Sequence, residues 1–280
     1  MTHTWINGNY VESAQASLGV GDLAIQRGYG VFDFFRCRQG IPFLLPWYLD
    51  RFFHSAQALN LEVPLSKSEL TAVIQEFIDK NQLVDEGIKM ILTGGYSPDS
   101  YTPLEPNLVI SAHKINFPAS EKYAQGFKVM THEYQRESPA AKSINYLQGI
   151  QLIPVLKARG LDDVLYHCGG VITEFPRSNV FIVDQHDQLV TPAKNVLPGI
   201  TRKTVLYLAK EHYSPTLRDI TVSELKQAKE VFFTSTTKGI VPVCAIDGHP
   251  VGDGVPGVVT KHLAQLLGDL AVDFSMPLEG

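Results

Sequence analysis

The stretch from residue 138 to residue 146 reads Ser138-Pro139-Ala140-Ala141-Lys142-Ser143-Ile144-Asn145-Tyr146. Its lysine, Lys142, stands among small and apolar side chains. An amine that loses water beside apolar groups gives up its proton more easily and can then attack a carbonyl carbon to form a Schiff base. The alternative is a surface lysine at a strand-to-helix junction, because most lysines are exposed. This stretch alone favours the surface lysine, so the remainder of the chain has to decide.

The composition is that of a globular protein with a sizeable core. The chain has 280 residues, of which 44% are hydrophobic and 19% charged, enough for one large domain or two modest ones. A net charge of −5 without blocks of like charge argues against nucleic acid or an anionic membrane as the main partner. No run approaches the roughly 18 apolar residues of a membrane span, and Met1–Trp5 does not resemble a signal peptide. We therefore expect a cytoplasmic enzyme that acts on small molecules.

The cysteines give no sign of a metal centre or of a disulfide framework. Cys37, Cys168 and Cys244 are scattered along the chain, and the pair His167-Cys168 has no partner at metal-ligand spacing. We expect reduced thiols without a catalytic role, and no metal site.

The first half of the chain mixes strands with helices. Asn7-Gly8 between two short apolar runs predicts a hairpin, because this pair accepts the positive φ values of a tight turn. Val31–Cys37 reads as a well-buried strand. Pro46 opens a helix that ends at Asn60, with Arg51 just outside its apolar stripe.

Two further strands and a capped helix complete this half. Ser66 and Glu69 form a capping box before an amphipathic helix. Ile88–Thr93 and Asn107–His113 read as strands, and Lys89 is the exceptional cation in the first of them. Because strands and helices do not alternate steadily, the pattern predicts an α+β fold rather than a doubly wound one.

The apolar pattern lapses around Pro118-Ala119-Ser120, which predicts a linker over residues 116–126. This linker separates an N-terminal domain of residues 1–115 from a C-terminal domain of residues 127–280. The second domain is predicted to hold strands at 127–134, 164–166, 171–173, 179–184 and 230–234, and helices at 146–159, from Gly199-Ile200 to His212, after Thr221, and at 258–267. Pro154 is expected to disturb the first of these helices.

Two segments of the second domain could hold a phosphate. In Leu197-Pro198-Gly199-Ile200-Thr201-Arg202 a turn leads into a helix, so that the amides of Ile200 and Thr201 and the Thr201 hydroxyl point outward together. Thr234–Thr237 adds hydroxyls and amides at the end of a strand. The alternative for the first segment is an ordinary helix start.

A carboxylate stands between two predicted strands of the same domain. Glu174 follows one strand and precedes another, where a side chain can project into a cleft. The alternative is a surface glutamate paired with Arg177. The residues themselves leave these two possibilities open.

Four motifs occur together in the order and approximate spacing of a known family. They are Lys142 with Asn145-Tyr146, Glu174 with Asn179, Leu197–Arg202, and Ser235-Thr236-Thr237. With them the chain resembles, over essentially its whole length, the class IV or fold type IV pyridoxal-phosphate aminotransferases, which include branched-chain aminotransferases, D-amino acid aminotransferases and aminodeoxychorismate lyase. The resemblance implies a small N-terminal α/β sandwich domain, a larger C-terminal α/β pseudo-barrel domain, and a homodimer with active sites near its interface.

The resemblance implies pyridoxal 5'-phosphate as the cofactor and Lys142 as its catalytic Schiff-base lysine. Glu174 then faces the pyridine nitrogen and keeps it protonated, while the Lys142 amine moves a proton between the substrate Cα and C4′. Tyr146 matches the tyrosine that bonds the ring hydroxyl in the branched-chain members of the family. Arg51 matches the phosphate arginine, although Tyr48 stands where the family usually has histidine. The implied cofactor-binding residues are Arg51, Tyr146, Glu174, Ser178, Asn179, Ile200, Thr201, Ser235 and Thr236.

The substrate side departs from both familiar patterns of the family. Thr93-Gly94-Gly95-Tyr96 lacks the arginine with which the well-known D-amino acid enzymes hold the substrate carboxylate, and branched-chain enzymes have tyrosine in place of Arg27 and arginine in place of Lys89. Two cations around an apolar pocket suit α-carboxylates and dicarboxylates, so we expect Arg27 and Lys89 to replace that arginine. The alternatives are an interface salt bridge for Arg27 and a solvated strand residue for Lys89. The predicted substrate-binding residues are Arg27, Phe32, Lys89 and Thr237.

The stretches 27–33 and 92–99 resemble a less typical branch of D-amino acid transaminases. We therefore predict transfer of an amino group between a D-amino acid, such as D-glutamate or D-alanine, and a 2-oxo acid such as 2-oxoglutarate. The resemblance leaves a branched-chain L-amino acid aminotransferase as the alternative. The resemblance gives less support to two other functions, an aminodeoxychorismate lyase and a protein that binds the cofactor without turnover.

Overall fold

The structure, a computed structural model, describes residues 2–270, and the chain forms two compact units. The first unit comprises Met1–Asn116 and Ala140–Asn145, and the second comprises Phe117–Pro139 and Tyr146–Gly280. The division differs from the predicted domains at two places. Residues 117–126, predicted as a linker, contain a helix of the second unit, and residues 140–145 belong to the first unit because their main chain bonds to one of its strands.

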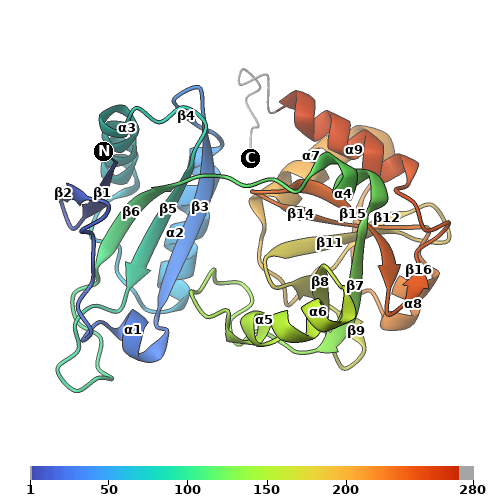
Figure 1. Ribbon diagram of the computed structural model, residues 1–280, viewed down its shortest axis with the longest axis horizontal. Coiled ribbons are helices and arrows are strands. Elements are labelled where there is room, and N and C mark those ends of the chain that lie inside the picture. The colour runs from blue at the N-terminus through green and yellow to red at the C-terminus, as the bar shows by residue number, and fades with distance from the viewer. Residues whose placement is uncertain (1, 271–280) are drawn as a thin grey trace. The chain divides into compact units, whose positions relative to one another are not determined.

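The first unit is built on a six-stranded sheet in the order β2-β1-β6-β5-β3-β4, with antiparallel neighbours (Figure 1). Its strands are β1 (His3–Ile6), β2 (Asn9–Glu12), β3 (Gly30–Arg38), β4 (Ile41–Pro42), β5 (Gly87–Thr93) and β6 (Leu108–His113). Asn7 and Gly8 both take positive φ between β1 and β2, which confirms the predicted hairpin.

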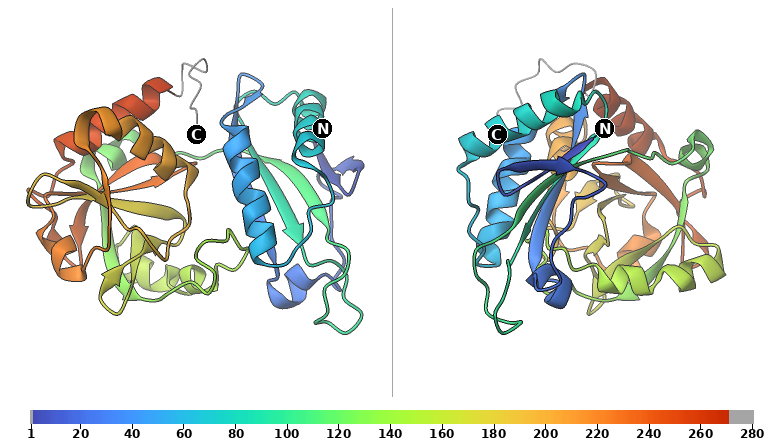
Figure 2. Two further views of the ribbon diagram at one scale, coloured as in Figure 1. Left: turned by 180° about the vertical axis from the view of Figure 1, so that it is seen from behind. Right: turned by 60° about the vertical axis from the view of Figure 1, so that its left-hand side comes forward.

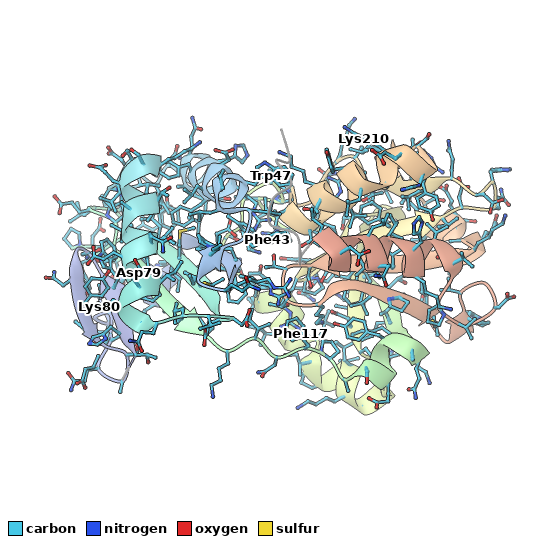
Figure 3. The ribbon with its side chains drawn as sticks, turned by 90° about the horizontal axis from the view of Figure 1, so that it is seen from above. Phe43, Trp47, Asp79, Lys80, Phe117 and Lys210 are labelled. Atoms are coloured by element: carbon cyan, nitrogen blue, oxygen red, sulfur yellow. The ribbon has the colours of Figure 1, made fainter. Side chains whose placement is uncertain are left out.

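Three helices accompany this sheet, namely α1 (Leu23–Arg27), α2 (Leu45–Ala58) and α3 (Lys67–Asn81). Helix α2 lies along one face of the sheet and packs on β3, whose Val31, Phe35 and Cys37 are fully buried (Figure 2). Helix α3 starts at the predicted capping box, and its charged residues Asp79 and Lys80 lie on its exposed side (Figure 3). The apolar stripes thus fix which faces of both helices are buried.

The second unit is built on a ten-stranded sheet in the order β13-β12-β11-β14-β15-β7-β8-β9, with β10 paired to β11 and β16 paired to β15. Its strands are β7 (Phe127–Glu133), β8 (Asp163–Cys168), β9 (Val171–Ile172), β10 (Glu174–Phe175), β11 (Ser178–Val183), β12 (Leu189–Thr191), β13 (Thr216–Leu217), β14 (Glu230–Ser235), β15 (Gly239–Ile246) and β16 (His249–Pro250). Strand β7 is parallel to both β15 and β8.

The described part of the second unit contains six helices. They are α4 (Ser120–Gln125), α5 (Leu147–Gln151), α6 (Ile153–Arg159), α7 (Ile200–Tyr213), α8 (Val222–Gln227) and α9 (Val258–Leu270). The break between α5 and α6 falls just before Pro154, as expected from a ring that cannot donate a helical hydrogen bond. Among the described helices, none is both long enough and apolar enough to cross a membrane.

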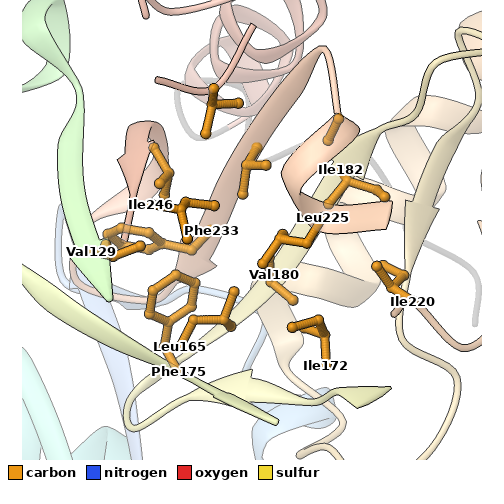
Figure 4. Packing of buried hydrophobic residues seen from close by; sticks show 14 of the residues in the cluster. Val129, Leu165, Ile172, Phe175, Val180, Ile182, Ile220, Leu225, Phe233 and Ile246 are labelled. Carbon is orange, nitrogen blue, oxygen red and sulfur yellow. The ribbon is translucent and has the colours of Figure 1, made fainter. Parts of the chain in front are cut away.

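The core of the second unit lies on both sides of its sheet. Phe175, Val180 and Phe233 meet Val129 and Ile246 on one side (Figure 4). On the other side α7 and α9 cover Phe181 and Phe232, whose rings stack with centroids 5.0 Å apart. Polar residues stand at the ends of three strands of this sheet, because Glu174 begins β10, Ser178 begins β11 and Ser235 ends β14.

Candidate active site

The main chain of Lys142 is fixed against the first unit's sheet. The Phe32 N–H donates to the Lys142 carbonyl at 2.9 Å, and the Ile144 N–H donates to the Gly30 carbonyl at 3.0 Å. Ser143 forms an isolated antiparallel bridge with Val31. The segment that carries the lysine is therefore held like a short additional strand at the edge of β3.

A second contact holds the same residue from helix α2. The Lys142 N–H donates to Oγ of Ser55 at 3.0 Å, and the Ser55 side chain is completely buried. Nζ of Lys142 lies 4.6 Å from the centre of the Phe32 ring. Phe32 thus contacts the lysine at both its main chain and its amine.

Lys89 faces the same aromatic ring. Its Nζ lies 5.3 Å from the centre of the Phe32 ring, and burial lowers the pKa of Lys89. The pKa of His113 is lowered as well, mainly by burial and further by Lys89. Lys89 is partly removed from water, so it is not the solvated strand residue of the alternative interpretation.

Arg51 is buried rather than lying outside the apolar stripe of its helix. Its Nη2 and Nε bond the two carboxylate oxygens of Asp33 at 2.6 and 2.9 Å, and the side chains are 6% and 0% exposed. Tyr48, which stands at the family's histidine position, places its ring 5.3 Å from the Arg51 guanidinium carbon. The fork of Arg51 is therefore fixed by a bidentate pair and an aromatic face.

Glu174 in the second unit is buried and held by several donors. Arg136 Nη1 lies 3.0 Å from its Oε1, and the Leu197 N–H donates to its Oε2 at 2.8 Å. Asn179 donates from Nδ2 to the Leu197 carbonyl at 2.9 Å and more weakly to Glu174 Oε2 at 3.4 Å. The alternative interpretation, in which Glu174 is a surface residue paired with Arg177, is therefore wrong. Sequence reasoning missed Arg136, since no local pattern links it to a carboxylate 38 residues away.

The start of α7 offers amides without a capping side chain. Gly199 is its N-cap residue and makes no side-chain cap bond, and no acidic residue occurs in the first turn. A Cβ on Gly199 would lie 1.9 Å from Asn179 Oδ1, so only glycine allows this close approach. Arg202 of the same run instead bonds Thr191 and Pro192. Ile200 and Thr201 remain the predicted anion donors.

A tight turn follows β14. The Lys238 N–H donates to Ser235 Oγ at 3.2 Å, and the Tyr123 hydroxyl donates to the Lys238 carbonyl at 2.9 Å. Thr234 stands opposite Asn179 in the register of β14 and β11. Its side-chain oxygen Oγ1 is buried and has no hydrogen-bond partner within residues 2–270. The turn is fixed from both sides, and beside it a buried hydroxyl is left to bind a polar group.

The other predicted residues occupy less decisive positions. Arg27 ends α1, is exposed, and donates from Nη1 to the Gln26 carbonyl at 3.0 Å. Tyr146 is the half-buried N-cap residue of α5, Ser178 begins β11 and is buried, and Thr237 is half-buried in the turn after β14.

The first unit thus brings together Lys142, Phe32 and Lys89, with Arg51 on the neighbouring helix. The second unit brings Glu174 and Asn179 together, close to the start of α7. Chemically, the first set offers an amine that can react with a carbonyl, and the second offers a fixed carboxylate and anion donors. Within residues 2–270 no group of three or more potential metal ligands occurs.

Comparison with known sequences places this chemistry in a family context. Residues 30–246 match the family profile described as amino-transferase class IV. The chain is 30% identical over 267 residues to the D-alanine aminotransferase of Bacillus licheniformis, a match that covers 93% of this chain and 94% of that protein.

Solved structures show the same fold. A branched-chain amino acid aminotransferase of Escherichia coli superposes with a TM-score of 0.89 at 28% identity, covering 96% of this chain and 94% of its own. The branched-chain amino acid aminotransferase from T.th., solved with pyridoxamine 5'-phosphate, gives a TM-score of 0.89 at 26% identity, covering 99% and 95% of the two chains. The predicted α+β fold of fold type IV is thereby confirmed.

Proposed function

Because the chain belongs to the class IV aminotransferase family, we propose that it moves an amino group between D-amino acids, such as D-glutamate or D-alanine, and 2-oxo acids such as 2-oxoglutarate. The family depends on pyridoxal 5'-phosphate. When bound, this cofactor withdraws electrons from the substrate Cα and carries the amino group. The fixed environment of the Glu174 carboxylate is the observation that carries the proposed amino-group transfer, and the similarity to a D-alanine aminotransferase supports the choice of D substrates.

The donors of the second unit fit a phosphorylated aromatic cofactor. The amides of Ile200 and Thr201 open α7 without a competing cap, which suits a phosphate. We assign Ser235 and Thr236 to the same anion. The Thr234 hydroxyl, which has no partner in the described part of the chain, supports the fit, because a buried polar atom without a partner is costly until a ligand bonds it.

Lys142 and Glu174 divide the proton chemistry. The Glu174 carboxylate holds a proton on the ring nitrogen, because its charge is kept in place by Arg136 and by the Leu197 amide. Nζ of Lys142 holds the cofactor between turnovers and moves the proton that the substrate Cα loses. Arg51 contributes to phosphate binding, and Tyr146 bonds the ring hydroxyl.

Lys89 and Arg27 hold the substrate carboxylates in this proposal. The ammonium of Lys89 is partly desolvated beside Phe32, and an anion that arrives there gains a charge-assisted hydrogen bond. Arg27 is exposed in the single chain, which suits a residue that serves a neighbouring copy. Thr237 completes the substrate side.

A spectral half-reaction screen tests the substrate class. The purified holoenzyme is mixed with one amino acid at a time, and the visible absorbance of its cofactor is followed. We expect D-glutamate or D-alanine to bleach this absorbance in the absence of any 2-oxo acid. A response to L-leucine or L-valine alone would refute the preference for D substrates.

A branched-chain L-amino acid aminotransferase is the second candidate, because the structural similarity to such enzymes is high. The same screen separates the two. A lyase is separated by pyruvate release from aminodeoxychorismate without an amino acceptor.

Two substitutions test the assigned roles. Lys142→Ala should remove the visible absorbance typical of the lysine-bound cofactor and abolish turnover. Glu174→Gln should retain the cofactor but slow the half-reaction, because a neutral amide cannot keep the ring nitrogen protonated. Turnover near the wild-type rate in either variant would show that the residue is misassigned.

We further propose a homodimer. Leu147, Ile150 and Ile153 recur at every third residue from α5 into α6 and are 61%, 61% and 43% exposed, so three large apolar side chains close together in sequence reach the surface. If a second copy covers them, Ile150→Glu should shift the mass measured by light scattering from dimer toward monomer. Lys210→Glu, on the exposed side of α7 (Figure 3), serves as the control.

A further inference from the structure

We propose that Ser55 is a positioning residue that fixes the direction of the Lys142 side chain. This inference rests on the proposed role of Lys142. Ser55 lies four residues after Arg51 on α2, so the two side chains share one buried face of the helix. One turn of α2 therefore carries the phosphate arginine and the next carries the serine that contacts the lysine.

The Lys142 main chain is held at both its N–H and its carbonyl. Ser55 Oγ accepts from its N–H at 3.0 Å, while its carbonyl accepts from the Phe32 N–H at 2.9 Å. These bonds fix the two peptide planes that flank the Cα, and with them the direction of the Cα–Cβ bond. The long side chain that carries the Lys142 amine therefore starts from a fixed position and in a fixed direction.

Ser55 has the properties that such a contact needs. It is fully buried, so water does not compete for its oxygen. A serine inside a helix commonly donates its own hydrogen to the carbonyl one turn earlier, which leaves the oxygen available to accept. An alanine at this position would remove the oxygen that accepts from the Lys142 N–H.

The position of the Lys142 amine depends on its main chain, because the amine also contacts the ring of Phe32. Nζ of Lys142 lies 4.6 Å from the ring centre, and Phe32 belongs to the same strand that accepts the lysine segment. A shift of the main chain would move Nζ relative to the ring and to the cofactor carbon. Misplacing a catalytic group by about 1 Å can cost on the order of 100-fold in rate.

Ser55→Ala is the test, with Ser55→Thr to restore the hydroxyl. In the Ser55→Ala holoenzyme we expect the bound cofactor to remain near one per chain and the saturating half-reaction rate with D-glutamate to fall by about 10-fold to 100-fold. The half-saturating concentration should change by less than about threefold, since substrate binding is not affected. The visible circular dichroism of the cofactor should weaken, and Ser55→Thr should recover both signals.

Thr4→Val is the matched control, because Thr4 is a buried hydroxyl of the same unit that bonds Ser13 instead. It should lose thermal stability while keeping the wild-type rate and dichroism. If Ser55→Ala resembles Thr4→Val in both readouts, the proposal is wrong. Should Ser55→Ala fail to fold, Ser55→Cys takes its place, since sulfur keeps the volume but accepts poorly.

Lys142→Ala, measured in parallel, separates the two proposals. If it loses the visible absorbance and Ser55→Ala behaves like wild type, only the role of Ser55 is overturned. If it keeps the absorbance, the assignment of Lys142 and the inference drawn from it fail together.

Discussion

Nη1 of Arg136 lies 3.0 Å from Oε1 of Glu174, and the two side chains are only 12% and 5% exposed. The same nitrogen lies 3.3 Å from the carbonyl of Pro139, three residues before Lys142. One arginine therefore pairs with the carboxylate and also holds the segment that leads to the lysine. The second bond gives Arg136 a role beyond charge compensation.

Removing the Arg136 charge should weaken both folding and catalysis. Arg136→Met removes the arginine that pairs with the buried Glu174 carboxylate, and breaking a buried ion pair costs about 3 to 5 kcal/mol of unfolding free energy. The Glu174 carboxyl group then favours its neutral form, and in its proposed role it would hold the proton on the ring nitrogen of the cofactor less well. Urea unfolding and the half-reaction rate with D-glutamate measure the two effects.

Arg177→Met provides the comparison, because Arg177 is close to Glu174 in sequence but exposed. We expect its unfolding free energy to stay within about 0.5 kcal/mol of wild type. Equal behaviour of the two variants would mean that the Arg136 pair contributes neither stability nor catalysis.

The buried pair of Arg51 and Asp33 predicts a coupling between stability and cofactor. Asp33→Asn removes the carboxylate that forms a buried pair with Arg51, so we expect the free energy of unfolding of the cofactor-free protein to fall by about 3 kcal/mol. If Arg51 binds the phosphate, the cofactor supplies the missing charge, and pyridoxal phosphate should raise the Tm of the variant more than that of wild type.

Asp50→Asn on the same helix is the control for this prediction. Asp50 pairs with Lys67, but the two side chains are 62% and 52% exposed, so water screens the pair. Its loss should change stability by less than about 1 kcal/mol with and without cofactor. An identical Tm gain in Asp33→Asn and wild type would argue against a phosphate contact of Arg51.

The sequence was informative wherever local chemistry decides the structure. Asn7-Gly8 specifies a turn, and Ser66 with Glu69 specifies a helix start, because in both cases the interacting groups lie within a few residues. Lys142 and Glu174 were found as candidates because their residue types stand out against their neighbours. The family resemblance then connected them.

Long-range contacts could not be read in the same way. Ser55 and Lys142 are 87 residues apart, and no pattern in either segment indicates the other. Helix α4 was predicted as a linker because it buries none of its residues and so lacks an apolar stripe. Strand β12 was missed because its three residues are too few to show a period.

Thiol labelling should distinguish the three cysteines. Burial raises the pKa of Cys37 to about 11, and burial also raises the pKa of Cys244. At pH 8 only about one Cys37 thiol in a thousand is the reactive thiolate, whereas Cys168 is exposed. Iodoacetamide should therefore add a single label to the native protein, at Cys168, and three after denaturation. Peptide mass spectrometry reads the positions, and rapid labelling of native Cys37 would contradict the buried β3 face.

Two glycine substitutions should have different effects, one weakening cofactor binding and the other stabilising the protein. In Gly199→Ala the new Cβ would lie 1.9 Å from Asn179 Oδ1, so Asn179 must move and its bonds to Glu174 and the Leu197 carbonyl are disturbed. We expect the Kd of pyridoxal phosphate to rise by about 10-fold or more, the effect of losing roughly one charged hydrogen bond.

In Gly268→Ala of α9 the new Cβ meets no atom of residues 2–270 within 4 Å, and the substitution should stabilise the protein by about 0.5 to 1 kcal/mol, because alanine loses less backbone entropy in a helix. Fluorescence titration of the cofactor and urea unfolding separate the two outcomes. If Gly199→Ala bound pyridoxal phosphate as tightly as Gly268→Ala does, the start of α7 would have to tolerate a displaced Asn179, and the assignment of this helix start to the phosphate would fail.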